Sequence, residues 1–274
     1  MQAISISSLK GGVGKTSVTT GLASAALSAG IPTLVVDLDP HADASTALGA
    51  APEGQLEIAR MLKAPRRVFL EDHVVQSPWV RRAAALHGHQ NRVLDVAYGG
   101  ALSGIYDRPD LGRRDLRRLA SVLDGIEGYG LVLIDCPPSL NGLTRMAWAA
   151  SSGVLLVAEP GLFSVAGTER TMRAIQLFRK EYAPRLAPAG IIANRVRTTS
   201  TEHSYRLSEM KQMFGPLLLT PHLPEVANWQ QIQGAAHAVH HWPGEAARST
   251  AALYDELLAS VLRHSRDSRP RATR

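Results

Sequence analysis

A glycine-rich loop near the start of the chain constrains the fold more than any other sequence feature. Residues 9–17 read Leu-Lys-Gly-Gly-Val-Gly-Lys-Thr-Ser. In the pattern G-x-x-x-x-G-K-[ST], backbone N–H groups surround phosphates, the lysine contacts the terminal phosphates and the hydroxyl binds Mg²⁺. The Gly-Lys-Thr at 14–16 matches the second half of this pattern, whereas Leu9 replaces the first glycine and Lys10 follows it. This is therefore a variant phosphate-binding loop with a second lysine near its start.

The residues around the loop favour the order strand, loop, helix. Residues 3–6 form a short apolar run, and residues 16–29 are rich in alanine and leucine and are followed by Gly30, a typical helix stop. A phosphate-binding loop must leave a strand and enter a helix, whose first N–H groups and positive dipole attract anions. The context therefore favours a phosphate site over an accidental Gly-Lys-Thr.

Two further apolar runs end in carboxylates. Residues 33–39 contain Asp37 and Asp39, and residues 131–135 end at Asp135. Apolar runs of this length between helical stretches indicate buried parallel strands, and ligands bind at the carboxyl ends of such strands. The sequence thus predicts a doubly wound α/β fold, a mostly parallel sheet with helices on both faces, whose carboxylates meet the phosphate loop and a hard cation.

Four segments together resemble the ParA branch of the ParA/MinD ATPases, in the family's order and at similar spacing. They are Lys-Gly-Gly-Val-Gly-Lys-Thr at 10–16, Asp-Leu-Asp-Pro at 37–40, Ile-Asp-Cys-Pro-Pro-Ser at 134–139 and Ile-Ile-Ala-Asn-Arg at 191–195. The resemblance extends over residues 1–262 and implies one ATPase domain there, with the P-loop NTPase fold of the deviant Walker A type.

The resemblance also implies which residues hold ATP and Mg²⁺. Lys15 would bind the β- and γ-phosphates, Thr16 would ligate Mg²⁺, and Ser17 would contact the α-phosphate. Asn194 would read the adenine edge, and Pro224 would open the loop that closes over the base. The implied nucleotide-binding residues are Gly11, Gly12, Val13, Gly14, Lys15, Thr16, Ser17, Asn194 and Pro224.

The implied catalytic residues are Lys10, Lys15 and Asp39. Lys10 would reach across a nucleotide-sandwich dimer to the ATP of a second copy, and Asp39 would orient the attacking water. Asp37 and Asp135 would support Mg²⁺ through water. Phosphoryl transfer needs positioning and charge neutralisation more than covalent chemistry. Because one lysine would come from a second copy, we expect slow hydrolysis that depends on dimerisation and is stimulated by a partner.

The sequence departs from the family pattern in three places. His41 stands where glutamine is usual, and Ala-Asp at 42–43 replaces Gly-Asn, so the first switch region is expected to behave differently. Asn228 lies near the place of an arginine that contacts DNA in several relatives. The segment 68–109 matches only the variable middle region of the family, and we expect it to be a solvated surface insertion.

Apolar periodicity predicts the remaining elements. The chain begins with a predicted strand and has no apolar run of about 18 residues, so we expect no signal peptide, no spanning helix and a cytoplasmic protein. The resemblance implies that the protein is nucleoid-associated. Helices are predicted over 108–123, 140–150, 168–182, 202–214 and 245–262, and strands over 154–158, 189–193 and 217–219.

Cysteine and histidine give little support for a metal site other than Mg²⁺. The single cysteine, Cys136, follows a strand and is expected to be a small buried residue. His237, His240 and His241 lack nearby cysteines or carboxylates in the usual ligand spacing, so a solvated surface cluster is expected.

The formal charge is +6, which favours an anionic partner. Residues 263–274 contain five arginines and one aspartate, a net charge of +4, and we expect them to form a disordered basic tail. Such a tail would bind DNA through its phosphates without reading bases. The candidate DNA contacts are Arg197, Arg206, Lys211, Arg248, Arg263, Arg266 and Arg269.

The leading interpretation is an ATP-dependent switch that forms a homodimer, binds nonspecific DNA and drives partition of a plasmid or chromosome, with a ParB-like or cargo-adaptor activator. One alternative is the positioning of a protein-complex cargo. Another is a MinD-like regulator of the division site on the membrane, which needs an amphipathic C-terminal helix, but no large apolar residue follows Leu262. An iron–sulfur carrier of the same fold would need more than one cysteine.

Overall fold

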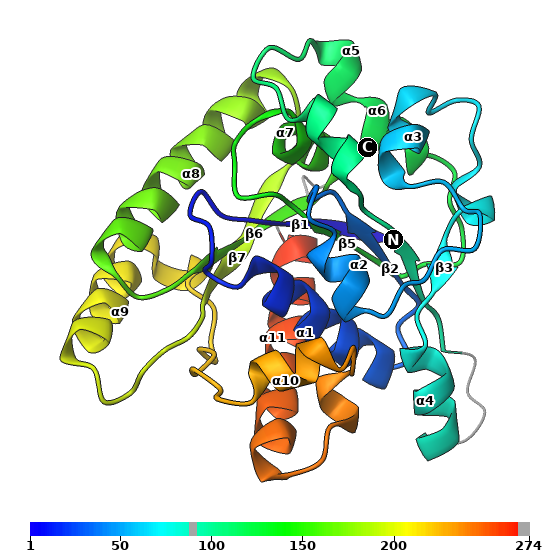
Figure 1. Cartoon of the computed structure of the whole chain (residues 1–274). Coiled ribbons are helices and arrows are strands. Elements are labelled where there is room, and N and C mark those ends of the chain that lie inside the picture. Colours follow the sequence, from blue (N-terminus) through cyan, green and yellow to red (C-terminus); the bar gives the residue numbers. More distant parts are fainter. Residues whose placement is uncertain (88–91, 268–274) are drawn as a thin grey trace.

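A seven-stranded sheet passes through the centre of the computed structural model, with helices on both faces (Figure 1). The structure describes residues 1–87 and 92–267. The strand order is β3-β4-β2-β5-β1-β6-β7; β3 is antiparallel to β4, and the other neighbours are parallel. The strands are β1 (Gln2–Ser7), β2 (Thr33–Asp37), β3 (Val75–Gln76), β4 (Leu94–Ala97), β5 (Leu131–Asp135), β6 (Gly153–Ala158) and β7 (Ala187–Ala193).

The helices divide between the two faces of the sheet (Figure 1). The long ones are α1 (Lys15–Ser28) and α11 (Glu245–Asp267) on one face, and α7 (Gly142–Ala150), α8 (Leu162–Glu181) and α9 (Thr201–Phe214) on the other. The shorter ones are α2 (Asp43–Ala47), α3 (Ile58–Lys63), α4 (Trp79–His87), α5 (Arg113–Leu116), α6 (Arg118–Val122) and α10 (Trp229–Gly234). The 3₁₀ turns are η1 (Leu70–Asp72), η2 (Ala101–Tyr106), η3 (Gly215–Leu217) and η4 (Val239–His241).

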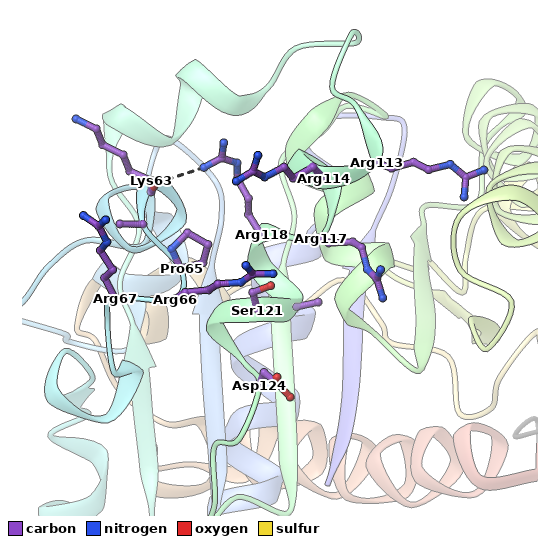
Figure 2. Close-up of a pocket in the computed structure, with 12 residues that line it drawn as sticks. Lys63, Pro65, Arg66, Arg67, Arg113, Arg114, Arg117, Arg118, Ser121 and Asp124 are labelled. Carbon is purple, nitrogen blue, oxygen red and sulfur yellow. Dashed lines mark hydrogen bonds between the residues drawn. The ribbon is translucent and has the colours of Figure 1, made fainter.

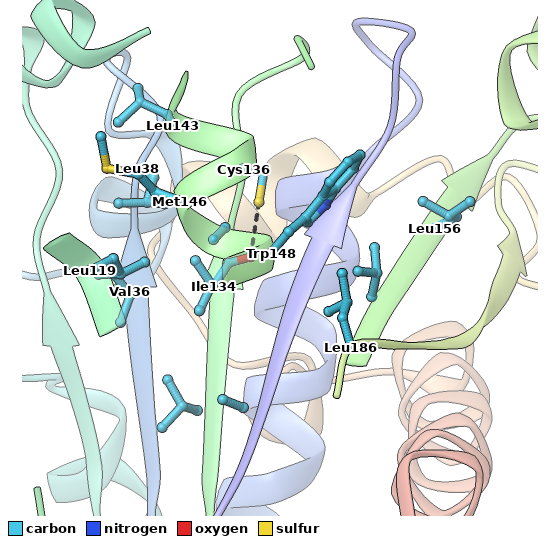
Figure 3. Packing of buried hydrophobic residues seen from close by; sticks show 14 of the residues in the cluster. Val36, Leu38, Leu119, Ile134, Cys136, Leu143, Met146, Trp148, Leu156 and Leu186 are labelled. Atoms are coloured by element: carbon cyan, nitrogen blue, oxygen red, sulfur yellow. Dashed lines mark hydrogen bonds between the residues drawn. The ribbon is translucent and has the colours of Figure 1, made fainter. Parts of the chain in front are cut away.

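Each central strand contributes side chains to two hydrophobic layers, because successive residues of a strand point to opposite faces. In β5, Val132 and Ile134 pack with α3, α6, α7 and α8, whereas Leu131 and Leu133 pack with α1 and α11. Figure 3 shows the first layer around Trp148, whose indole N–H donates to Ser7 Oγ (3.1 Å). The strands are buried on both sides, which explains their nearly continuous apolar sequences.

Helix α1 ends as the sequence predicts. Gly30 has φ +70° and donates its N–H to Leu27 O (3.2 Å), and Ile31 donates to Ala26 O (2.9 Å). These two bonds satisfy carbonyls of the last turn, and glycine reaches positive φ without a side-chain clash. The turn then leads directly into β2.

Two predicted elements have a different secondary structure from the one expected. The single helix expected over 108–123 is two short helices, α5 and α6, because the chain turns at Arg117 (φ −89°, ψ 0°), and Leu116 and Leu119 remain buried. The strand expected over 217–219 is the 3₁₀ turn η3 followed by one bridge from Leu218 to Ile191. The other predicted helices and strands are confirmed, with α8 starting earlier than expected.

The segment 68–109 is not a solvated insertion. It contains α4 and the strands β3 and β4, and β4 pairs with β2 inside the sheet. Trp79 is 2% exposed and donates its indole N–H to Ala236 O (2.8 Å). The polar Asp95 interrupts the short apolar run of β4, and its carboxylate accepts a hydrogen bond from Tyr129 Oη (2.7 Å). Because of this interruption, the apolar pattern did not predict β4 as a strand.

The C-terminal boundary also differs from the expectation. Helix α11 continues to Asp267, so the first residues of the predicted tail, including Arg263, are helical. Arg269 and the remainder of the tail lie outside the described residues. Within residues 1–87 and 92–267, no helix is long and apolar enough to cross a membrane.

Candidate nucleotide-binding site

The phosphate-binding loop lies between β1 and α1, in the predicted order. Gly12 and Gly14 have φ +75° and +90°, and α1 begins at Lys15. A Cβ atom on Gly14 would lie 2.3 Å from Asn194 Nδ2, so this position needs glycine for space as well as for its backbone angle. The loop therefore presents backbone N–H groups and the N-terminus of α1 to the same cavity.

This cavity has a volume of about 460 Å³ and is lined by Lys15, Thr16 and Ser17, together with Asp39. Thr16 Oγ1 donates to Asp135 Oδ2 (2.8 Å), and Ser17 Oγ donates to Gln233 Oε1 (3.3 Å). The predicted phosphate and metal ligands of the loop thus share one cavity, and a carboxylate lies behind Thr16.

Asp37 and Asp135 lie side by side at the carboxyl ends of β2 and β5, where they are register partners. Both are fully buried. Asp37 Oδ2 accepts from the backbone N–H (2.8 Å) and hydroxyl (2.7 Å) of Ser45, and Asp135 Oδ1 accepts from Thr19 Oγ1 (2.7 Å). The common edge that the sequence predicts for these carboxylates is confirmed.

Burial raises the pKa of both carboxyl groups. For Asp37, the charge of Asp135 adds to the increase, and the hydrogen bonds from Ser45 oppose it. For Asp135, hydrogen bonds from Thr19 and Thr16 and the charge of Lys15 oppose the effect of burial. A divalent cation next to this pair would favour the ionised forms. The hydroxyl of Thr16 and these oxygens are donors that suit Mg²⁺.

Asp39 reaches the cavity itself. It lies two residues beyond β2, is 9% exposed, and its Oδ1 accepts a hydrogen bond from the N–H of His41 (3.0 Å). His41 and Asp43 also line the cavity. Asp39 is therefore placed where a carboxylate could face a bound phosphate or a water beside it, and the unusual His41 adjoins it.

Lys10 does not line this cavity. Its side chain is 48% exposed, and Nζ lies 4.0 Å from Glu159 Oε2, at the end of β6. An exposed ion pair of this length contributes little stability, so the ammonium group can leave Glu159 at low cost.

Asn194 and Pro224 line a second cavity of about 480 Å³, which shares Ser17, Arg195 and Gln233 with the first. Asn194 Nδ2 donates to Val13 O (2.8 Å), so the amide binds the loop in this structure. Trp229 Nε1 has no hydrogen-bond partner among the described residues and lies at this cavity. The two cavities together suit a ligand with phosphates at one end and a ring at the other.

Several residues of the site were not predicted from the sequence. Thr19 and Ser45 bind the buried carboxylates, and Arg195 (φ +55°) donates from Nη1 to Gly12 O (2.7 Å). Gln233 binds Ser17, and Tyr254 Oη in α11 donates to Ser17 O (3.2 Å). Arg195 ends the segment 191–195 that carries the resemblance, although no role was expected for it. Thr19 follows the phosphate loop in α1, and the others lie outside the four segments.

The expectations for cysteine and histidine have different outcomes. Cys136 is buried, as predicted, and burial raises its pKa to about 12, so it is a neutral thiol. The solvated histidine cluster is wrong for His240, which is only 9% exposed and lies between Ser24 Oγ (2.7 Å) and Asp255 Oδ1 (3.0 Å). Burial lowers its pKa, against the charge of Asp255. The described residues contain no cluster that could hold a metal through histidine, cysteine and carboxylates.

The candidate DNA residues do not form one cluster of free cations. Arg206 lies between Glu202 (2.7 Å) and Glu209 (2.9 Å), and Arg197 Nε lies 3.9 Å from Glu225. Lys211 and Arg248 are exposed on α9 and α11, and Arg263 Nη2 donates to Ser260 Oγ (3.0 Å). The backbone of Arg266 belongs to α11, and Arg269 is outside the described residues.

Known proteins share this architecture. A family model described as an AAA domain matches residues 1–187. The chromosome partitioning protein ParA of Caulobacter vibrioides is 28% identical over 279 residues, which cover 99% of this chain and 98% of the relative.

Two solved structures show the same fold. The ATP complex of a McdA variant from Cyanothece has a TM-score of 0.77 at 18% identity, covering 100% of this chain and 99% of the other. Cobyrinic acid a,c-diamide synthase from Mycobacterium smegmatis, with a bound ATP analog and magnesium, has a TM-score of 0.75 at 21% identity, covering 98% and 97%.

Proposed function

Because this chain belongs to the ParA/MinD family of ATPases, we propose that it is an ATP-dependent switch that pairs with a second copy, binds DNA of any sequence and drives partition of a plasmid or chromosome. The strongest support is the placement of the two lysines. Lys15 lines one cavity together with Thr16 and Asp39, whereas the half-exposed Lys10 lies outside it and is free to meet a second copy.

The proposed ligand is ATP with Mg²⁺. The structural neighbours crystallised with ATP, or with an ATP analog and magnesium, share the fold, and the donor set of this chain suits the same group. Lys15 would neutralise the terminal phosphates, and the Thr16 hydroxyl would bind the metal, with Asp37 and Asp135 behind it. Ser17 would face the α-phosphate, and Asn194 and Pro224 would hold the base after Asn194 releases Val13 O.

Bound Mg²⁺ would neutralise part of the negative charge on the phosphate oxygens. Asp39 would orient the water that attacks the γ-phosphate. The missing positive charge would come from Lys10 of a second copy, because Lys10 does not line the phosphate cavity of its own chain. Hydrolysis would therefore be slow in the monomer and would need both pairing and a ParB-like or cargo-adaptor activator.

DNA binding is the part of the proposal that rests on charge. The formal charge of +6 and the arginines of the last twelve residues favour a phosphate backbone over a neutral partner. The domain would comprise the chain through α11, followed by the basic tail.

A gel-shift assay with random duplex DNA, ATP and Mg²⁺ tests this function. We expect binding with ATP and weaker binding with ADP, and binding should fall steeply as salt increases. Sedimentation with a non-hydrolysable ATP analog should show a dimer. Unchanged DNA mobility at low salt would eliminate the DNA switch, and a monomer in the analog would eliminate the pairing.

A further inference from the structure

A basic groove lies on the sheet face opposite α1 and has a volume of about 880 Å³. Lys63, Arg66 and Arg67 come from the end of α3 and the chain after it. Arg113, Arg114, Arg117 and Arg118 come from α5 and α6, and Asp124 is the acidic residue that lines the groove. In Figure 2, Arg66 and Arg67 stand on one wall, Arg117 and Arg118 on the other, and Arg113 points away.

Most of these charges are not neutralised by the protein. Arg118 is bound to Asp115 (2.8 Å) and Leu62 O (3.0 Å), and Arg113 lies 4.0 Å from Glu181. Among residues 1–87 and 92–267, none makes an ion pair with the charged groups of the other five cations or accepts a hydrogen bond from their side chains: Lys63, Arg66, Arg67, Arg114 and Arg117. Like charges that outnumber their counter-charges repel one another, so the groove has a field that favours a polyanion.

We propose that this groove binds the phosphate backbone of DNA. The proposal rests on the DNA-binding function proposed above and locates it on a surface that the motifs do not mark. Guanidinium groups match phosphate oxygens with two parallel hydrogen bonds, and six of the seven groove cations are arginines.

The form of the groove favours a backbone over a small phosphorylated ligand. Small-molecule sites enclose most of the ligand and fix it with a few precisely held polar groups. Here the five unneutralised cations are exposed, and no ion pair among the described residues holds their charged groups. Exposed cations on both walls of an open groove suit a continuous chain of phosphates, which requires charge but no base contacts.

Two of the candidate DNA contacts, Arg197 and Arg206, compete less well for the same role. Arg206 is already paired with Glu202 and Glu209, and Arg197 with Glu225. A phosphate would have to displace a carboxylate from each of them, whereas the five unneutralised groove cations need no such exchange.

The groove is separate from the nucleotide site. None of its lining residues lines either of the two nucleotide cavities, and it lies on the other side of the sheet from α1. Neutral substitutions in the groove should therefore leave ATP binding and pairing intact.

The test compares three double variants of the full chain, each lacking two positive charges. Arg114→Gln/Arg117→Gln and Arg66→Gln/Arg67→Gln alter the groove. Arg81→Gln/Arg170→Gln is the control, because both arginines are exposed, have no ion pair among the described residues and lie elsewhere. Affinity for random duplex DNA is measured with ATP and Mg²⁺ over a range of salt, alongside ATP binding, sedimentation and thermal melting.

If the groove holds the backbone, each groove variant weakens DNA binding and lowers the slope of log affinity against log salt by roughly 1.8, for two lost phosphate contacts. The control keeps the wild-type slope, and all variants bind ATP and pair normally. If the groove variants bind DNA as the control does, the groove is not the DNA-binding site, although the protein still binds DNA.

Two further outcomes distinguish failure of the proposed DNA-binding function from binding of the groove to a lipid surface. If the wild-type protein binds no DNA, the proposed function fails together with the groove. If groove variants keep DNA binding but lose binding to phosphatidylglycerol vesicles, the groove belongs to a lipid surface and the proposal is overturned.

Discussion

Three aspartates of similar sequence context have different environments. Asp37 and Asp135 are fully buried and bound by hydroxyl groups, whereas Asp39 lines the cavity. Their common position at one sheet edge follows from parallel strands and could be predicted. The hydroxyls of Thr19 and Ser45 could not, because no spacing rule connects a residue in α1 or α2 with a carboxylate in a strand.

Asp39→Ala should separate ATP binding from ATP hydrolysis. The phosphate ligands of the loop remain, so nucleotide affinity should change little, while turnover should fall by roughly 10²-fold or more because the water loses its orienting group. Radiolabelled ATP binding and phosphate release measure the two effects. Asp43→Ala, at the same cavity, is the control. Normal turnover in Asp39→Ala would show that the assignment is wrong.

Asp37→Asn should change how stability depends on pH. Burial, together with Asp135, raises the pKa of Asp37 to about 7, against about 3.9 in the unfolded chain. The native state therefore binds the extra proton, and the stability from this group, present at low pH, is lost as pH rises through 7. Asparagine does not titrate, so the stability of Asp37→Asn relative to wild type should increase from pH 5 to pH 8.

Urea unfolding without nucleotide or Mg²⁺ at both pH values measures this difference. Asp72→Asn is the control, because Asp72 is exposed and has no ion pair among the described residues. An equal difference at pH 5 and pH 8 for Asp37→Asn would contradict the raised pKa.

At the scale of elements, α1 and α11 are the pair that connects the nucleotide site with the rest of the core. Tyr254 of α11 lies directly on Gly21 of α1, and its hydroxyl binds Ser17 O. The sequence predicts both helices, and Gly21 lies inside the first, where glycine is less favourable than alanine. The structure explains Gly21, because an aromatic ring occupies the space where a Cβ atom would lie.

Gly21→Ala should therefore destabilise the protein. The added Cβ would lie 2.1 Å from the ring of Tyr254, and overpacking of a core typically costs about 1–3 kcal/mol. Gly167→Ala in α8 is the matched control: nothing lies within 4 Å of its Cβ, so alanine should stabilise that helix by about 0.5–1 kcal/mol. Opposite signs in chemical unfolding are expected; a neutral Gly21→Ala would show that α11 can shift freely.

The segment 68–109 shows where element prediction fails. Its strands are short and each carries a polar residue, so neither strict alternation nor a long apolar run marks them. Pairing of β4 with β2 and burial of Trp79 against Ala236 are long-range contacts. Tertiary packing therefore overrode a weak local pattern.

For the molecule as a whole, the main consequence is that each chain holds most of the site but leaves Lys10 outside it. The ammonium group rests near Glu159, beyond the first cavity. On the proposed function, an assembly of two copies would bring this charge to the phosphates, and activity would then be a property of the pair.

Lys10→Ala should bind ATP but fail to pair. Lys15 and the loop backbone remain, so nucleotide affinity should be close to wild type, whereas sedimentation with a non-hydrolysable analog should show a monomer. Lys180→Ala, an exposed lysine on α8, should pair normally. A dimer of normal stability in Lys10→Ala would remove the pairing role of this residue.

Local sequence was enough to place the strand, phosphate loop and helix, the apolar strands and the carboxylates at their ends, because these features depend on neighbours a few residues apart. Packing placed the rest. Tyr254 reaches Ser17 across 237 residues, and the walls of the basic groove come from residues 63–67 and 113–118. Such contacts depend on which helix faces meet across the sheet, and the order of residues along the chain does not state this.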